Sequence, residues 1–238
     1  MLIDPSDLRS DLDTLEGIEK ASMRLVTQAI VDFREEASAI FNSETDLPQD
    51  FAEDITREAL DQLGVSKIPQ RLYGKIDYKR ARYVFHPDYA LRQALFVDSK
   101  AEKTSGKSTA TLQIAQTSLK IMHVRTGSAV EVQGTLEPII HSEIGSFLST
   151  TIFVKYNYEE DEDGATTLDS ITVACVPHAF LQEKYNPDSE NTFWRAGRNA
   201  PTLGEAFRVR LVFRLLKERA VWRVQQVPAT PSSFEWLE

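Results

Sequence analysis

The sequence predicts a mixed α/β (α+β) fold, in which a central mixed sheet is flanked by helices. Apolar residues recur with a helical period early in the chain, whereas later segments are rich in β-branched and aromatic residues. The 238 residues are 42% apolar and 26% charged, which is ordinary for a globular protein. No repeat or long linker divides them, so we expect a single domain over residues 1–238.

The N-terminal part, residues 1–66, is expected to be helical. Between Ser10 and Asn42, apolar residues recur at steps of three and four positions, which places them on one face of a helix. A second helix is expected from about Pro48 to Leu63, and Gly64 is placed to end it.

The rest of the chain is expected to be mostly strands. Residues 67–125 predict a hairpin of strands 72–85 and 91–97, followed by a helix from Thr111 to Ile121. The segment 126–147 gives no clear prediction. Further strands are expected within residues 148–227, at 148–159, 168–176, 205–214 and 221–227.

Composition excludes several kinds of protein and site. The longest apolar runs, such as 94–97, are too short to span a membrane, and the first residues lack the pattern of a signal peptide. Cys175 is the only cysteine, which rules out an internal disulfide and a multi-cysteine metal site. The four histidines are scattered, which argues against a zinc site.

The net charge of −9 is unevenly distributed. Residues 67–125 carry 12 basic and 4 acidic groups, and residues 191–238 carry 8 and 4. Residues 1–66 carry 5 and 16, and residues 126–190 carry 2 and 12. Two basic segments can fold into one basic face suited to nucleic acid, because the local field at the binding groove is what matters. The alternative is that these side chains lie on solvated surface.

The hairpin contains the residues that point to chemistry. If its turn is centred between Pro87 and Asp88, paired residues have numbers that sum to 175, as Asp77 and Asp98 do. Two carboxylates would then lie about 5 Å apart at the backbone. Side chains alternate along a strand, so Lys100 shares a face with Asp98.

Two adjacent carboxylates repel each other unless a cation lies between them. Magnesium prefers hard oxygen ligands, and it often uses one or two carboxylates together with substrate phosphate. A nearby lysine can orient a water molecule and offset charge that builds on the phosphate. The pattern therefore favours Mg²⁺-assisted phosphodiester hydrolysis. The alternative to a catalytic site is an exposed hairpin whose acidic and basic side chains form solvated ion pairs.

These residues also resemble a known signature. Ile76-Asp77 followed by Val97-Asp98-Ser99-Lys100 is similar to the PD…(D/E)xK motif of type II restriction endonucleases, with Ile76 where proline is usual. The wider match is to the SfiI type and runs from the first helix to about Val227. The similar stretches are 52–56, 74–80, 184–188, 196–198, 208–210 and 222–223.

The resemblance implies a PD-(D/E)xK restriction endonuclease-like core and a cytoplasmic enzyme of a bacterial or archaeal restriction-modification system. Such an enzyme cuts double-stranded DNA at a defined site with Mg²⁺ and acts as a homodimer or homotetramer. Asp77 and Asp98 would bind the metal with the Ser99 backbone carbonyl, and Lys100 would handle the attacking water. Glu53 or Asp54 on the second helix would add an outer-shell carboxylate, and the equally favoured alternative is that both simply lie on the surface of that helix.

Sequence readout needs a second site. In the expected strand 205–214, apolar residues alternate with Arg208, Arg210 and Arg214, so one face is apolar and the other basic. Arginine reads guanine in the major groove, which makes Arg208 and Arg210 candidates for base contacts, with Arg198 and Arg214 as further DNA-binding candidates. The resemblance implies an interrupted G·C-rich palindrome. The alternative is that these arginines pair with phosphates or with acids of the protein.

Two other functions are compatible with parts of the sequence. The segment Ala101–Ser108 resembles a relaxed phosphate-binding loop, which predicts a following helix and an NTPase. A DNA-binding module without catalysis would also explain the basic segments, although it leaves Asp77, Asp98 and Lys100 without a role.

Overall fold

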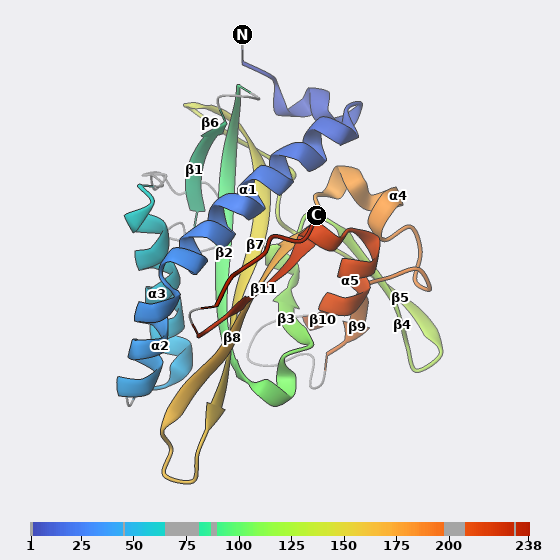
Figure 1. The fold of residues 1–238 in the computed structure, drawn as a ribbon. Helices are drawn as coiled ribbons and strands as arrows, with labels where there is room; N and C mark the ends of the chain where they lie inside the picture. Colours follow the sequence, from blue (N-terminus) through green and yellow to red (C-terminus); the bar gives the residue numbers. More distant parts are fainter. Residues whose placement is uncertain (1, 45, 65–80, 87–89, 198–207, 231) are drawn as a thin grey trace.

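The computed structural model describes residues 2–44, 46–64, 81–86, 90–197, 208–230 and 232–238. The chain forms a large mixed sheet with helices against one face and a smaller sheet on the other (Figure 1). The predicted fold class, a mixed central sheet flanked by helices, is confirmed. None of the described helices is long and apolar enough to cross a membrane.

The N-terminal part is helical, as predicted. The expected first helix is two helices that meet at Phe33, and Asp11 caps the first by accepting a hydrogen bond from the Thr14 backbone N–H at 3.1 Å. Pro48 begins the third helix, where its missing N–H costs nothing. The helices are η1 (Pro5–Arg9), α1 (Leu12–Asp32), α2 (Arg34–Ser43) and α3 (Pro48–Gln62).

The large sheet has the order β1-β2-β7-β8-β11, with β6 beside β7. Strands β2 and β7 are parallel and the other pairs are antiparallel, which makes the sheet mixed. Its strands are β1 (Ala81–His86), β2 (Leu91–Lys103), β6 (Ile139–Ser142), β7 (Gly145–Glu160), β8 (Thr166–Val176) and β11 (Val224–Pro228). Strands β2 and β7 lie at the centre and carry the long apolar runs.

The second sheet has the order β3-β10-β9 and lies beside the large sheet, near the β4–β5 hairpin (Figure 1). Its strands are β3 (Thr109–Gln113), β9 (Trp194–Ala196) and β10 (Arg208–Val212). The other elements in this half are β4 (Lys120–Arg125), β5 (Ser128–Gln133), α4 (Gln182–Tyr185) and α5 (Phe213–Arg219). Strands β5, β6 and the start of β7 occupy residues 126–147, the segment that had no clear prediction.

Alternation along β7 builds a core on each side of the large sheet. Ile152 and Val154 pack with the apolar faces of α1, α2 and α3. Phe153 points the other way and packs with Val209 and Leu211 of the small sheet. Each side chain on β2 or β7 therefore belongs to either the helix side or the small-sheet side of the large sheet.

The hairpin register differs from the prediction. The structure pairs Ala81 with Phe96 and His86 with Leu91, so the numbers sum to 177 rather than 175. The centre of the pairing therefore lies one residue later in the chain than predicted, and Ala90, with a φ of +46°, belongs to the connection between the strands. Asp77, for which the pairing with Asp98 was predicted, lies outside the described residues.

The helix predicted from Thr111 to Ile121 is wrong. Thr109–Gln113 is strand β3, a short 3-10 turn follows, and Lys120 begins strand β4. Ala110 and Leu112 are buried while Thr111 and Gln113 are half-buried, so the segment has the two-residue period of a strand. Its partner β10 lies far away in the sequence, so the local pattern of residues does not indicate this pairing.

Candidate active site

Asp98 and Lys100 lie on the small-sheet side of β2. In the parallel ladder Asp98 is opposite Phe153 and Lys100 is opposite Lys155, and Phe153 packs against the small sheet. The Lys100 ammonium lies 3.0 Å from Oδ2 of Asp98, and Asp98 is only 4% exposed. The predicted pairing of a carboxylate with a lysine on one strand face is therefore present, next to a partly exposed Lys100.

Ser99 lies between them and points to the helix side. Its hydroxyl donates a hydrogen bond to Thr56 Oγ1 of α3 at 2.8 Å, and Thr56 in turn lies 2.8 Å from the Tyr156 hydroxyl of β7. This buried chain of hydroxyls fixes β2 against α3 at the point where the strand carries its charged residues. The Ser99 side chain is therefore structural. The group of Ser99 that was expected to bind a metal is its backbone carbonyl, and this expectation stays a prediction.

The remaining acids of the predicted site have different positions. Asp77 lies outside the described residues. Glu53 and Asp54 are exposed on α3, and Asp54 pairs with Arg57 at 2.7 Å. Among the residues that the structure describes, no three His, Cys, Asp or Glu side chains are grouped closely enough to hold a metal ion. The predicted metal site depends on Asp77 and stays a prediction.

Sequence reasoning missed Lys155, which lies on β7 directly beside Lys100. Lys155 is fully buried and its ammonium donates to Glu102 Oε2 at 2.9 Å. Burial lowers the pKa of Lys155, and the Glu102 carboxylate acts in the opposite direction. The signal in the sequence was a single lysine within the mostly apolar run 152–156, because a lysine buried there needs a partner for its charge.

The predicted reading strand is present but shorter than expected. Within β10, Val209 and Leu211 are fully buried while Arg208 and Arg210 are half-buried, so the alternation of apolar and basic faces is observed. Arg195 of β9 lies opposite Arg210 and is exposed, which adds a third arginine to the same face. Sequence reasoning missed Arg195 because its place beside Arg210 depends on the pairing of distant strands.

Of the other two arginine candidates, Arg214 lies among the described residues and Arg198 does not. Arg214 was expected on the strand, but the strand ends at Val212 and Arg214 lies in α5, exposed and paired with Glu218 one turn later. That expectation is wrong because the helix begins at Phe213 and turns the arginine away from the strand face. Arg198 lies outside the described residues.

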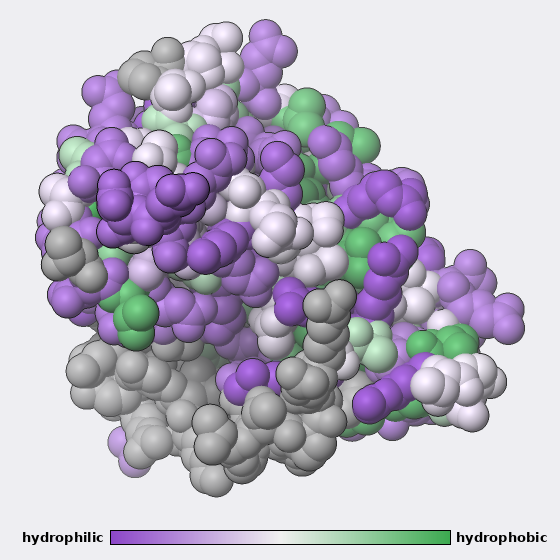
Figure 2. Space-filling model, turned by 90° about the horizontal axis from the view of Figure 1, so that it is seen from below, coloured by the Kyte–Doolittle hydropathy of each residue, from purple (hydrophilic) through white to green (hydrophobic). Residues whose placement is uncertain are grey.

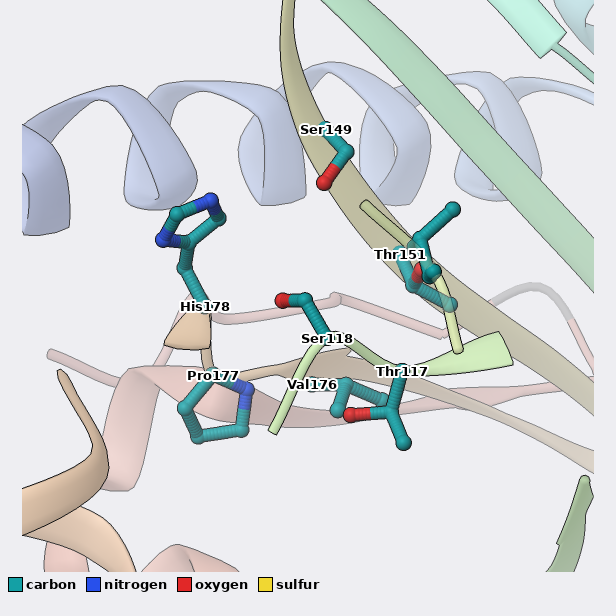
Figure 3. A pocket seen from close by; sticks show the side chains of 8 residues that line it. Thr117, Ser118, Ser149, Thr151, Val176, Pro177 and His178 are labelled. Atoms are coloured by element: carbon teal, nitrogen blue, oxygen red, sulfur yellow. The ribbon is translucent and has the colours of Figure 1, made fainter. Parts of the chain in front are cut away.

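Several polar side chains line a small cavity of about 10 Å³ between β7 and the end of β8 (Figure 3). His178 lines it, and both ring nitrogens are occupied: Nε2 lies 3.0 Å from the Pro138 carbonyl and Nδ1 accepts from the Phe180 N–H at 3.2 Å. Burial lowers the pKa of His178 to about 4, so the ring is neutral near pH 7. His178 is therefore structural and unsuited to act as a general base.

Arg223, in one of the stretches that resembles the SfiI type, is also structural. It is fully buried, donates to Glu19 Oε2 at 2.6 Å, and stacks on the Tyr185 ring with 4.2 Å between the guanidinium carbon and the ring centre. Glu19 also accepts a hydrogen bond from the His178 backbone N–H at 2.8 Å. This buried ion pair joins α1 to the C-terminal part of the chain and has no free face for DNA.

Comparison with known proteins establishes the family. The family model described as "Type II restriction enzyme SfiI" matches residues 15–227. The chain belongs to the SfiI family of type II restriction enzymes. The type II restriction enzyme SfiI of Streptomyces fimbriatus is 35% identical over 230 aligned positions, which cover 91% of this chain and 85% of that protein. The resemblance inferred from the sequence is confirmed.

Solved structures of SfiI and of a second enzyme agree with this chain over nearly its whole length. A crystal structure of the tetrameric restriction endonuclease SfiI bound to cognate DNA has a TM-score of 0.84 and 33% identity, and covers 98% of this chain and 90% of that one. A crystal structure of the restriction endonuclease BglI bound to its DNA recognition sequence has a TM-score of 0.74 and 18% identity, and covers 94% of each chain. The BglI match shows the shared fold alone.

The SfiI-family fold also overturns the phosphate-loop reading of Ala101–Ser108. Its first residues are the end of β2, Thr104–Gly106 form a 3-10 turn, and Thr109 begins strand β3. A phosphate-binding loop requires a helix after the loop, whose N-terminus binds the phosphates. This segment leads into a strand, so the NTPase interpretation is wrong.

Proposed function

We propose that this chain cleaves double-stranded DNA at a specific site by Mg²⁺-dependent hydrolysis of phosphodiester bonds. The observation that carries the proposal is the pair of Asp98 and Lys100 on one face of β2, in a chain of the SfiI family. The crystallised SfiI is described as bound to cognate DNA. The structural setting of the pair, a buried carboxylate beside a partly exposed lysine, suits a catalytic role better than a solvated surface role.

The chemistry follows from the groups on β2. Asp98 and the Ser99 backbone carbonyl offer the hard oxygen atoms that Mg²⁺ prefers, and Asp77 is the second carboxylate of the motif. When bound, Mg²⁺ neutralises charge on the scissile phosphate and lowers the pKa of water. The Lys100 ammonium lies 3.0 Å from Asp98 Oδ2, and it can also hold a water molecule or a phosphate oxygen. The outer-shell role of Glu53 remains part of this proposal.

We propose that Arg208 and Arg210 contact guanine bases, with Arg195 beside them. The three lie on one face of a three-stranded sheet whose other face is apolar and buried. Such a basic sheet face can lie against the major groove, where arginine forms paired hydrogen bonds with guanine. A G·C-rich, interrupted palindrome is the expected target, cut to leave a 3′ overhang. Viewed from below, most of the surface formed by the described residues is hydrophilic (Figure 2).

A palindrome is read by two copies related by a two-fold axis, so we propose that the chain acts as a dimer or a tetramer. SfiI itself is described as tetrameric. The cytoplasm of a bacterium or archaeon with a partner methyltransferase is the expected setting. Light scattering tests the assembly, and a strictly monomeric protein that makes concerted double-strand breaks would contradict it.

Digestion of large natural DNAs tests the proposed function directly. The purified protein is incubated with these DNAs in Mg²⁺ without ATP, and the fragments are sized and their ends sequenced. We expect discrete fragments that share one interrupted G·C-rich site. Intact DNA, or a random smear from wild-type protein, would overturn the proposal. A non-catalytic DNA-binding module would retard the same DNAs without cutting them.

A further inference from the structure

One cluster of charged side chains, of which Lys155 is fully buried, joins the two sheets beside the candidate active site. Glu102 lies on β2, two residues after Lys100 on the same face, and its Oε2 is 2.9 Å from Lys155 Nζ and 3.5 Å from Arg210 Nη1. Arg210 also donates to the hydroxyl of Thr109 on β3 at 3.3 Å. The cluster therefore connects the strand that carries the catalytic candidates with the strand that carries the DNA-reading candidates.

Lys155 has no hydrogen-bonding capacity left over. Its three N–H groups donate to Glu102 Oε2 at 2.9 Å, to the Gly106 carbonyl at 2.6 Å and to the Thr109 carbonyl at 2.5 Å. These bonds hold the loop between β2 and β3 against the large sheet. A Cβ at Gly106 would lie 2.8 Å from Glu102 Oε2, so the loop packs directly on this carboxylate. Glu102 is thus fixed from two sides.

Arg210 differs from Lys155 in its exposure and in its use of hydrogen-bond donors. Its side chain is 31% exposed, and its contact with Glu102 is long for a hydrogen bond. A guanidinium has five N–H donors, of which the contacts with Glu102 and Thr109 use a fraction. Arg210 is therefore oriented by Glu102 and yet keeps donors for a ligand.

The charges of the cluster explain why both Glu102 and Lys155 are needed. A carboxylate beside Arg210 alone would cancel its positive charge and weaken its attraction to DNA. Lys155 already neutralises Glu102, so one net positive charge remains, and it lies on the partly exposed Arg210. If the guanidinium turns toward DNA, Glu102 keeps its buried partner and no uncompensated charge is left behind.

We propose that Glu102 is a specificity-determining positioning residue: it directs the Arg210 guanidinium toward the DNA base, and Lys155 neutralises it. This inference rests on the proposed function, because it assumes that Arg210 reads a base. It assigns Glu102 no contact with the substrate and no part in the hydrolysis itself.

A double-mutant cycle tests it. Dissociation constants are measured in Ca²⁺ for a duplex that contains the mapped cleavage site and for a duplex of scrambled sequence. The proteins are wild type, Glu102→Gln, Arg210→Lys and the double variant, with a matched control cycle of Glu102→Gln and Arg208→Lys. Arg208 is the suitable control because it lies two residues from Arg210 on the same strand face.

We expect Glu102→Gln to lower the ratio of specific to nonspecific affinity about tenfold, with nonspecific affinity unchanged. The loss should vanish when Arg210 is already lysine and persist when Arg208 is lysine. Equal losses in both backgrounds, no loss at all, or an equal loss of nonspecific binding would each overturn the inference.

A second variant separates positioning from folding. Lys155→Met alone leaves Glu102 without its buried cation and can fail to fold, so Glu102→Gln combined with Lys155→Met is made as a neutral replacement. We expect the combined variant to regain thermal stability relative to Lys155→Met while its specificity ratio stays low. If the combined variant recovers both thermal stability and the specificity ratio, the cluster is structural only and the inference is overturned. A wild-type protein that binds both duplexes equally contradicts the proposed function itself, and this inference with it.

Discussion

Lys155 lies directly opposite Lys100 in the parallel ladder between β7 and β2, so two lysines are neighbours on one face of the sheet. Like charges at such positions repel each other unless each has a partner. Lys155 is fully buried and bonded to Glu102 and two carbonyls, whereas Lys100 is 22% exposed and paired with Asp98. We therefore propose that Lys155 serves the fold and that Lys100 serves the proposed chemistry.

Replacement of the two lysines should separate these roles. Lys155→Met leaves Glu102 without its buried cation, so we expect a loss of about 3–5 kcal/mol in the free energy of unfolding. Lys100→Met leaves the buried Asp98 without its cation, but the Lys100 side chain is itself partly exposed, so we expect a smaller loss of about 1–3 kcal/mol. Urea unfolding followed by circular dichroism measures both. Equal losses of stability in the two variants would contradict the division.

The buried pair of Arg223 and Glu19 should be a major contributor to stability. Arg223→Met leaves Glu19 buried without its cation, and we expect a loss of about 3–5 kcal/mol in unfolding free energy. Arg214→Met is the control, since Arg214 is exposed and its pair with Glu218 lies on a helix surface. The control should stay within about 0.5 kcal/mol of wild type in the same urea titration. A comparable loss in the control would mean that burial of the pair is not the cause.

Stability should fall as pH falls below about 6.5, in part through His178. In the unfolded chain this histidine takes up a proton near its ordinary pKa of 6.5, whereas burial in the fold lowers the pKa to about 4. The unfolded state binds more protons between these values, so the stability present above pH 6.5 declines toward pH 4 by about 3 kcal/mol. Urea unfolding across this range measures it. His178→Gln should show a shallower decline, and an identical slope would contradict the assignment.

The sequence predicted the architecture well where a pattern is local. The N-terminal helices, the strands that became β2, β7 and β8, and the mixed sheet all follow from the spacing of apolar residues. The errors lie where distant contacts decide the outcome. Residues 111–121 were expected to be helical, but the first of them belong to β3, which pairs with β10. The hairpin register depends on the connection that includes Ala90, and the residue pattern does not predict the positive φ of Ala90.

The candidate site could be predicted only in part for the same reason. Asp98 and Lys100 are two residues apart on one strand, so their shared face follows from the sequence. Lys155 and Arg195 reach the site through strand pairing with β2 and β10, and nothing local indicates which strands are neighbours. Arg214 was misplaced because the change from strand to helix at Phe213 is not marked by a proline or glycine.

Base readout should depend on Arg208 and Arg210 but not on Arg214. Each alanine variant at the first two positions should lose about 1–3 kcal/mol of discrimination between the cleavage site and a scrambled duplex, with most nonspecific binding kept. Arg214→Ala removes the same charge from the α5 surface and should keep full discrimination. Fluorescence anisotropy at two salt concentrations measures this. Uniform weakening on every duplex would assign the arginines to phosphate contacts instead.

Asp98 and Lys100 are the residues that we propose to catalyse DNA cleavage. The most direct test is a plasmid cleavage assay in Mg²⁺ with wild type, Asp98→Asn and Lys100→Ala, together with binding of the same DNA in Ca²⁺. We expect wild type to produce discrete linear fragments, and both variants to bind the DNA as folded proteins without cutting it. Cleavage by either variant within a few-fold of the wild-type rate would contradict the assignment of this site.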